Sequence, residues 1–282
     1  MAETERPWAI DAGLAGDLGD ALGWAADDGA GALAEVLPTL VPVGSTAKLA
    51  SIASGEVPPG ADPDLLARRV LDHLEAKATR PAGGAPSPTW SCWVLATVMA
   101  ALVDAAGIGP VRVAATRRVD EQAPVVDLHA AVLVGGSGGA ELICDPYFGL
   151  SVELPSGAEA VAAASTALSE SSVARSHDGG WMLDVRLRRW DQTLRYRLVG
   201  AALDRGDVHA MAAISVTCSG VPSRPYARIH PDGSSIVDAS ETADGTGLLR
   251  TWSPSERGSE AAFASWSDAA DGFAERTGIR VV

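Results

Sequence analysis

The sequence has 282 residues, of which 47% are hydrophobic and 21% are charged, as in a soluble globular protein that buries a full core. Asp and Glu outnumber Lys and Arg by 36 to 22, and the resulting net charge of −14 argues against a nucleic-acid footprint or a polybasic membrane patch. No apolar run approaches the roughly 20 residues of a bilayer span, and residues 1–7 are acidic rather than basic. We therefore expect a cytoplasmic protein with neither a signal peptide nor a membrane helix.

Residue types that are scarce or absent narrow the chemistry. The three cysteines, Cys92, Cys144 and Cys218, are too widely spaced for a Cys-x-x-Cys metal site or a disulfide framework, so we expect no bound metal. The sequence contains no Asn, which excludes a Cys-His-Asn triad. A residue that orients a catalytic histidine would have to be Asp, Glu or Gln.

The N-terminal part is predicted to be helical. Short helices are expected over residues 17–24 and 31–37, the second ending at Pro38, because proline interrupts a helix. A longer helix over residues 62–78 has apolar residues at helical spacing, a proline at its first position and Asp62 as its N-cap.

A second long helix follows a Pro/Gly-rich loop. Thr89 or Ser91 is a suitable N-cap, and Gly107 is a suitable terminator. Cys92 therefore lies in the first turn, where free N–H groups and the helix dipole favour an anionic thiolate. The apolar stripe of this helix consists of Leu95, Val98, Met99 and Leu102.

A β-hairpin follows this helix. After a strand over residues 111–116, the segments 128–134 and 140–145 flank the loop GGSGG. If Val134 faces Ala140, the numbers of paired residues sum to 274, and His129 lies directly opposite Asp145. A carboxylate in that position fixes the tautomer of the imidazole and raises its basicity.

The second half of the chain has weaker patterns. Residues 156–176, rich in Ala and Ser, are expected to form a helix with a loop, and residues 259–277 a closing helix. Residues 223–245 are expected to be a loop with one short strand over 234–238. Strands with alternating apolar residues are predicted over 182–187, 193–199 and 212–217.

Cys92, His129 and Asp145 together form a recognisable chemical set. A thiolate attacks an acyl carbon, an imidazole moves the proton, and a carboxylate orients the imidazole. The N–H of Cys92 at a helix N-terminus is suited to stabilising an oxyanion.

The segments SCWVLATVMAALVDAAGI, LHAAVLV and CDP resemble the core of the transglutaminase-like superfamily, in which a Cys on a helix precedes a strand His and an Asp followed by Pro. The Cys-to-His gap of 37, the His-to-Asp gap of 16 and the continuation DPYFG are similar to the arylamine N-acetyltransferase branch. The sequence departs from that branch in lacking its Arg-Gly-Gly and Pro-Phe-Glu-Asn motifs. The resemblance implies that Cys92 is the acylated nucleophile, His129 the base and Asp145 the orienting residue.

The fold class expected from these patterns and this resemblance is α+β. It has a papain/transglutaminase-like core, in which the catalytic Cys at a helix N-terminus packs on an antiparallel β-sheet. The expected organisation is a helical region over residues 1–80, a catalytic core over 81–155 and a β-rich region with a closing helix over 156–282.

The leading functional hypothesis is an acyltransferase of specialised metabolism that forms an amide or ester through an acyl-Cys thioester. The donor would be an acyl-CoA or a carrier-protein thioester and the acceptor a small-molecule amine or hydroxyl compound, with no tightly bound cofactor. Arg117 and Arg118 are candidates for holding the phosphates of coenzyme A, or simply form a solvated turn. Four aromatic residues flank the candidate site in the sequence and either line an apolar acyl pocket or belong to the ordinary core: Trp90, Trp93, Tyr147 and Phe148.

Two other functions fit the same residues. A cysteine hydrolase, protease or transglutaminase-type enzyme would use the same triad with water or a protein amine as acceptor. A non-catalytic scaffold would keep the fold with an unreactive Cys92. The fate of the acyl group distinguishes the first alternative, and the kinetics of thiol alkylation distinguish the second.

Overall fold

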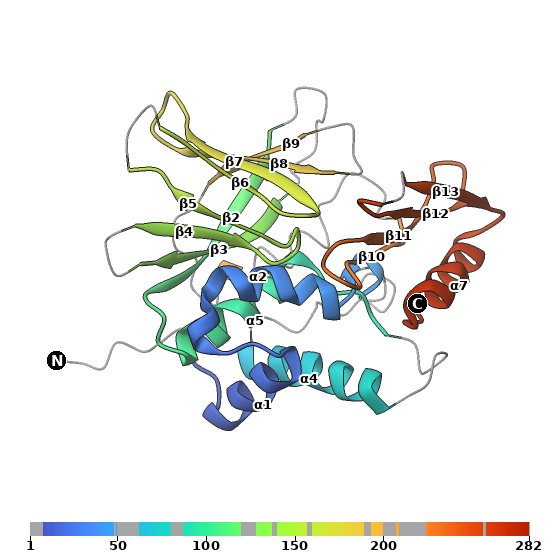
Figure 1. The fold of residues 1–282 in the computed structure, drawn as a ribbon, viewed down its shortest axis with the longest axis horizontal. Helices are drawn as coiled ribbons and strands as arrows, with labels where there is room; N and C mark the ends of the chain where they lie inside the picture. The colour runs from blue at the N-terminus through green and yellow to red at the C-terminus, as the bar shows by residue number, and fades with distance from the viewer. Residues whose placement is uncertain are drawn as a thin grey trace.

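The structure is a computed structural model. It describes residues 8–47, 49, 62–79, 87–119, 128–136, 140–156, 160–188, 193–199, 207–208, 224–255 and 258–281. Within these residues, α-helices occupy the N-terminal part, and two antiparallel sheets follow, the second covered by the C-terminal helix (Figure 1). The expected α+β class is therefore confirmed.

Four helices form the first layer: α1 (Ala12–Leu22), α2 (Gly29–Leu40), α4 (Pro63–Thr79) and α5 (Cys92–Ala105). The N-cap prediction for α4 is confirmed, because the Asp62 side chain accepts a hydrogen bond from the Leu65 N–H at 3.2 Å. Pro38 does not end α2 as expected but lies inside it. Near the helix end the proline removes only one intrahelical hydrogen bond, and its ring is buried in the core.

The larger sheet has eight strands in the order β5-β4-β3-β2-β9-β8-β7-β6. It curls so that β5 at one end lies against β6 and β7 at the other, enclosing its own apolar core. The strands are β2 (Val111–Arg118), β3 (Leu128–Gly135), β4 (Glu141–Asp145), β5 (Leu150–Leu154), β6 (Val161–Ser165), β7 (Ser169–Arg175), β8 (Trp181–Leu187) and β9 (Leu194–Leu198).

Strands β6 and β7 correct the helix expected over residues 156–176. Buried and less buried residues alternate along β7, from Ser169 to Val173, which is the period of a strand and not of a helix. Ala and Ser have no strong β preference, so pairing with β8 decides the conformation over local propensity.

The smaller sheet has the order β1-β10-β11-β12-β13. Its strands are β1 (Val43–Gly44), β10 (Tyr226–Ile229), β11 (Ile236–Glu241), β12 (Gly247–Trp252) and β13 (Ser259–Phe263), and helix α7 (Trp266–Thr277) covers it. The segment expected as one closing helix is therefore a strand followed by a helix, and Ser265 caps α7 by accepting the Asp268 N–H at 3.3 Å. The strand predicted over 212–217 lies outside the described residues.

The two-residue strand β1 connects the smaller sheet to the start of α5. On one side Val43 and Gly44 pair with Arg228 and Ala227 of β10. On the other side the Gly44 N–H donates to the Trp90 carbonyl at 3.1 Å. The smaller sheet is thus joined through two residues to the segment that leads into Cys92.

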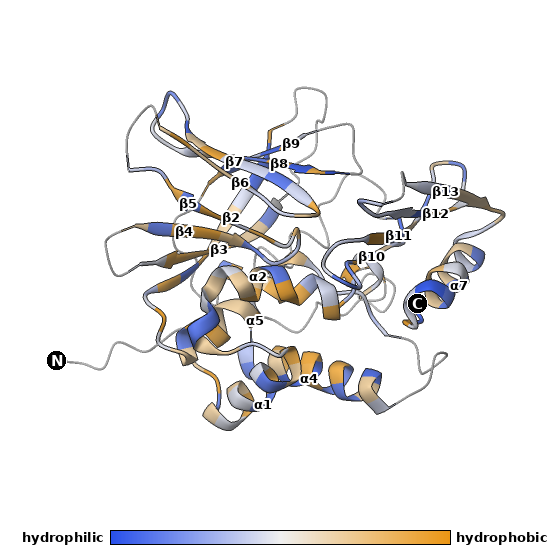
Figure 2. Cartoon of the chain, viewed as in Figure 1, coloured by the Kyte–Doolittle hydropathy of each residue, from blue (hydrophilic) through white to orange (hydrophobic). Residues whose placement is uncertain are grey.

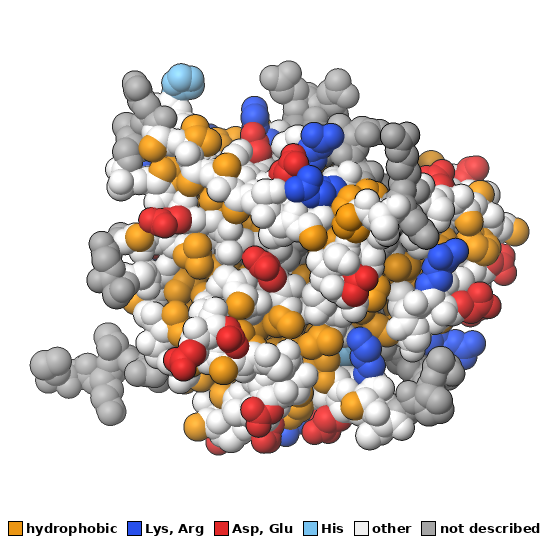
Figure 3. Space-filling model, in the orientation of Figure 1, with side chains coloured by type: hydrophobic (Ala, Val, Ile, Leu, Met, Phe, Trp, Pro, Cys, Tyr) orange, Lys and Arg blue, Asp and Glu red, His pale blue; other side chains and the backbone are white. Residues whose placement is uncertain are grey.

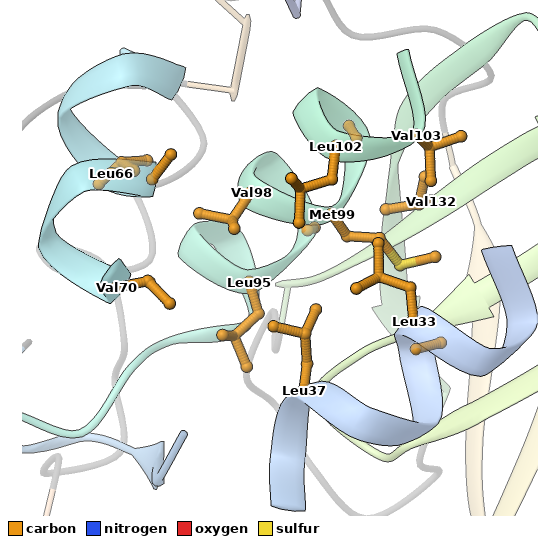
Figure 4. Packing of buried hydrophobic residues seen from close by; sticks show 14 of the residues in the cluster. Leu33, Leu37, Leu66, Val70, Leu95, Val98, Met99, Leu102, Val103 and Val132 are labelled. Atoms are coloured by element: carbon orange, nitrogen blue, oxygen red, sulfur yellow. The ribbon is translucent and has the colours of Figure 1, made fainter. Parts of the chain in front are cut away.

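Helix α5 is the centre of the main hydrophobic core (Figure 4). On one side it packs against Leu66 and Val70 of α4, and on the other against Leu33 and Leu37 of α2 and against β3. The predicted stripe is buried as expected; its four members, Leu95, Val98, Met99 and Leu102, are at most 1% exposed. Apolar residues accordingly predominate along α5 and along β3, a strand that it packs against (Figure 2).

The surface carries mixed charges. On the face shown in Figure 3, basic side chains over the curled sheet are interspersed with acidic ones. Two ion pairs on that sheet are Arg195–Asp184 at 2.7 Å and Arg188–Glu170 at 3.0 Å. Among the described residues, every helix is too short or too polar to span a bilayer.

The junction at β1 predicts a strong effect of Gly44→Ala. A Cβ at Gly44 would lie 2.0 Å from the Tyr226 carbonyl oxygen and 2.8 Å from the Thr89 hydroxyl oxygen. Because backbone atoms cannot yield cheaply, we expect a loss of about 1–3 kcal/mol in the free energy of unfolding, measured by denaturant titration.

The matched control for this prediction is Gly16→Ala in α1. No atom lies within 4 Å of the position that a Cβ would take there, so alanine should stabilise the helix by about 0.5–1 kcal/mol. Equal stability of wild type and Gly44→Ala would show that the β1 junction is not tightly packed.

Candidate active site

Cys92 is the first residue of α5, as the sequence predicts. Ser91 is the N-cap, and its hydroxyl oxygen accepts a hydrogen bond from the Val94 N–H at 3.5 Å. The N–H groups of Cys92 and Trp93, which precede Val94 in the first helical turn, have no acceptor within the helix and lie near the sulfur. The Cys92 side chain is half-buried at the edge of the main core.

His129 of β3 and Asp145 at the end of β4 form a direct pair. Nε2 of His129 lies 2.6 Å from Oδ2 of Asp145, and the two residues are 5% and 0% exposed. The other carboxylate oxygen, Oδ1, accepts hydrogen bonds from the N–H groups of Tyr147 at 3.0 Å and Phe148 at 3.2 Å. Both oxygens of the buried carboxylate therefore have fixed partners.

The turn after Asp145 has the geometry that this bonding requires. The Gly149 N–H donates to the Asp145 carbonyl at 2.9 Å and closes the turn. Gly149 has a φ of +67°, which a residue with a side chain adopts only with strain. A Cβ there would also lie 3.1 Å from Cγ of Pro38 in α2. The sequence DPYFG thus encodes a turn whose backbone N–H groups point at the carboxylate.

The register of the hairpin differs from the prediction by two residues. Val134 pairs with Leu142 and not with Ala140, so the numbers of paired residues sum to 276. Gly135 remains in the ladder opposite Glu141, and the five-residue connection is 136–140. Because side chains alternate with a period of two, a shift by two keeps His129 and Asp145 on the same face. The pair is therefore diagonal and still within hydrogen-bonding reach.

Three aromatic rings surround the imidazole of His129. The ring centroids of Tyr147, Phe148 and Tyr196 lie 5.5, 5.1 and 5.2 Å from that of His129. Sequence reasoning did not single out Tyr196, which comes from β9. Its only signal was a buried position in the alternating pattern of that strand, and the strand order that brings β9 beside β2 is not visible in the sequence.

The electrostatics of His129 favour the protonated imidazole. Burial lowers its pKa, but the charge of Asp145, the charge of Cys92 and hydrogen bonds with both raise it, so the pKa lies well above its ordinary value. Because Nε2 is bonded to Asp145, Nδ1 is the nitrogen left for the Cys92 sulfur. The arrangement therefore favours a protonated imidazole beside the Cys92 sulfur.

The other candidate residues divide into two groups. Trp90 and Trp93 are 5% and 3% exposed and pack in the core around α5. Arg117 and Arg118 lie at the end of β2, directly after Thr116, which pairs with His129.

Among the described residues, no three His, Cys, Asp or Glu side chains are grouped as a metal site would require.

Comparison with solved structures shows which fold this is. An arylamine N-acetyltransferase from M. tuberculosis matches with a TM-score of 0.68 and 18% identity, over 93% of this chain and 92% of that one. An N-arylamine acetyltransferase from Mycobacterium smegmatis matches with a TM-score of 0.69 and 13% identity, over 94% and 92% of the two chains. One from Bacillus cereus, described as having a Cys-His-Glu catalytic triad, matches with a TM-score of 0.66 and 12% identity, over 95% and 99%.

No protein-family model matches the chain, and no curated protein matches it in sequence. The chain nevertheless has the transglutaminase-like fold of the arylamine N-acetyltransferases over almost its whole length. The resemblance, which the sequence shows in residues 91–108, 128–134 and 144–146, therefore extends as a fold far beyond the segments that carry its motifs.

The raised pKa of His129 predicts a pH-dependent contribution to stability. A group whose pKa rises on folding stabilises the fold fully below its unfolded pKa, and this stabilisation is lost as the pH rises through its folded pKa. The free energy of unfolding lost in Asp145→Asn should thus be largest below about pH 6.5 and shrink at higher pH. Denaturant titrations of wild type and Asp145→Asn, at pH values below and above about 6.5, measure this difference in the free energy of unfolding.

The control for this prediction is the same substitution in a His129→Gln background. There the cost of Asp145→Asn should no longer vary over this pH range, because the titrating partner is absent. A cost that is independent of pH in the wild-type background as well would contradict the coupling between the two side chains.

Proposed function

We propose that the protein is a cysteine-dependent acyltransferase related to the arylamine N-acetyltransferases, with Cys92 as nucleophile, His129 as base and Asp145 as orienting residue. The observation that carries the proposal is the buried 2.6 Å contact between His129 Nε2 and Asp145 Oδ2, which leaves the other ring nitrogen for a cysteine at a helix N-terminus. The shared fold supports it, since the similar structures are those of arylamine N-acetyltransferases.

The first half-reaction is acylation of Cys92. The thiolate attacks the carbonyl carbon of a thioester donor, and the first-turn N–H groups of α5 stabilise the negative oxygen that forms. When the tetrahedral intermediate collapses, the bond from the acyl carbon to the donor sulfur breaks. The departing thiolate takes the proton from the His129 imidazolium, and Asp145 keeps the ring in place.

The second half-reaction transfers the acyl group to an acceptor. The neutral imidazole of His129 removes a proton from an amine or hydroxyl group as that group attacks the acyl carbon. The bond from the acyl carbon to the Cys92 sulfur then breaks, and the thiolate–imidazolium pair is regenerated. The product is an amide or an ester.

The proposed donor is an acyl thioester of coenzyme A or of a carrier protein, and the proposed acceptor is a small molecule, as in specialised metabolism. Arylamine acetylation is named for the structures that this chain resembles. The missing Arg-Gly-Gly motif beside the nucleophile, where this chain has Pro88, Thr89 and Trp90, favours a donor or acceptor that differs from theirs. Tyr147 and Phe148, which contact the imidazole, are proposed to line the acyl site.

Intact-protein mass spectrometry after incubation with acetyl-CoA, longer acyl-CoAs and simple acyl thioesters tests the proposal. Wild type should gain the mass of one acyl group, and added amines or alcohols should remove it and identify the class of acceptor. Cys92→Ala should gain nothing. Cys144→Ala, which removes a different buried thiol, should still be acylated.

Turnover should depend steeply on the three residues. Cys92→Ala should abolish it, His129→Ala should nearly do so, and Asp145→Ala should reduce it on the order of 10²- to 10⁴-fold. Acylation of wild type that is discharged only by water would identify a hydrolase instead. A Cys92→Ala protein with full activity would refute the mechanism.

A further inference from the structure

Arg228 of β10 is a charged residue in an unusual environment. It is 0% exposed and therefore among the largest fully buried side chains of the described residues. Directly opposite it on β11 lies Asp238, also 0% exposed. A guanidinium ion removed from water costs several kcal/mol unless specific partners compensate, so its position calls for an explanation.

One of its partners is the turn that follows Asp145. Nη2 of Arg228 donates a hydrogen bond to the Tyr147 carbonyl oxygen at 2.5 Å. That carbonyl belongs to the same peptide group as the Phe148 N–H, which donates to Oδ1 of Asp145 at 3.2 Å. A single planar peptide group thus lies between the guanidinium and the carboxylate.

The chain of hydrogen bonds continues to the nucleophile. The other carboxylate oxygen of Asp145 is hydrogen-bonded to Nε2 of His129, and the His129 side chain is in turn hydrogen-bonded to Cys92. A cation on the carbonyl oxygen polarises the peptide and strengthens its N–H as a donor. The peptide plane is also fixed, because it cannot rotate without losing both bonds.

The same arginine contacts the aromatic rings beside His129. Its Cζ lies 4.9 Å from the ring centroid of Tyr147 and 5.4 Å from that of Phe148, as in a cation–π contact. Both rings pack against the imidazole. Arg228 therefore restrains the backbone and the side chains of the turn together.

We propose that Arg228 is a positioning residue of the active site, which holds the Tyr147–Phe148 peptide so that Asp145 keeps the orientation needed by His129. The inference rests on the proposed function, and it assigns to the smaller sheet a role in catalysis. Strand β10 of this sheet pairs with β1, and β1 is hydrogen-bonded to Trp90 in the segment before Cys92. Arg228, also on β10, restrains the turn after Asp145.

The rate of Cys92 alkylation by iodoacetamide at neutral pH tests this role, because it reports the thiolate without any acyl donor. Arg228→Met should lower the rate roughly 10-fold, as small displacements of catalytic groups do. Arg228→Lys keeps the positive charge but lacks the planar guanidinium group, so it should lower the alkylation rate only about threefold. Loosening of the fold alone would expose Cys92 and raise the rate.

The matched control is Arg250→Met. Arg250 lies on β12 of the same sheet, opposite Asp238, but its guanidinium is exposed and pairs with Glu260 at 2.8 Å. This variant should alkylate within about twofold of wild type, as surface changes away from a site do. Circular dichroism and thermal unfolding verify that each variant is folded.

A double-mutant cycle with Asp145→Ala separates positioning from general stability. If Arg228 acts through Asp145, Arg228→Met should have no further effect on alkylation in the Asp145→Ala background. If Arg228→Met does not fold, the same comparison is made with Arg228→Lys in the wild-type and the Asp145→Ala backgrounds. Equal losses in both backgrounds, or no loss in either, would overturn the inference.

The cycle also distinguishes this inference from the proposed function. If wild-type Cys92 reacts no faster than Cys92 in Asp145→Ala, the triad does not operate and both proposals fail. If the rate depends on Asp145 but not on Arg228, only the positioning role is refuted.

Discussion

The buried carboxylate of Asp145 is the constraint on which the site depends. A wholly buried carboxylate needs hydrogen-bond partners, and here one oxygen is hydrogen-bonded to His129 while the other accepts hydrogen bonds from two N–H groups of its own turn. The turn can supply these donors because Gly149 accepts a positive φ at its end. The position of His129 follows from the carboxylate, and the protonation of His129 from the charges around it.

The two sheets have different relations to this carboxylate. The curled eight-stranded sheet supplies His129, Asp145 and the aromatic wall around the imidazole. The smaller sheet supplies none of these groups, yet it touches the backbone on both sides of the site, through β1 and through Arg228. A part of the chain that looks peripheral in sequence is thereby joined to the candidate catalytic centre.

The hairpin illustrates why the site was easier to predict than its register. The alternation of LHAAVLV and ELICD defines which residues share a face, and this survives the two-residue error in pairing. The exact pairing depends on where the glycine-rich loop begins, and glycine is compatible with the ladder as well as with the turn. The helix wrongly expected over 156–176 has a similar origin, because Ala and Ser accept either conformation.

The Cys92 helix and the face shared by His129 and Asp145 could be predicted from the sequence, since they depend on local periodicity, helix capping and strand alternation. Which strands lie beside the site follows from the packing of the whole chain, which brings Tyr196 against the imidazole and Arg228 against the Tyr147 carbonyl. Contacts between residues 81 positions apart come from the packing of whole sheets, and no local pattern encodes them.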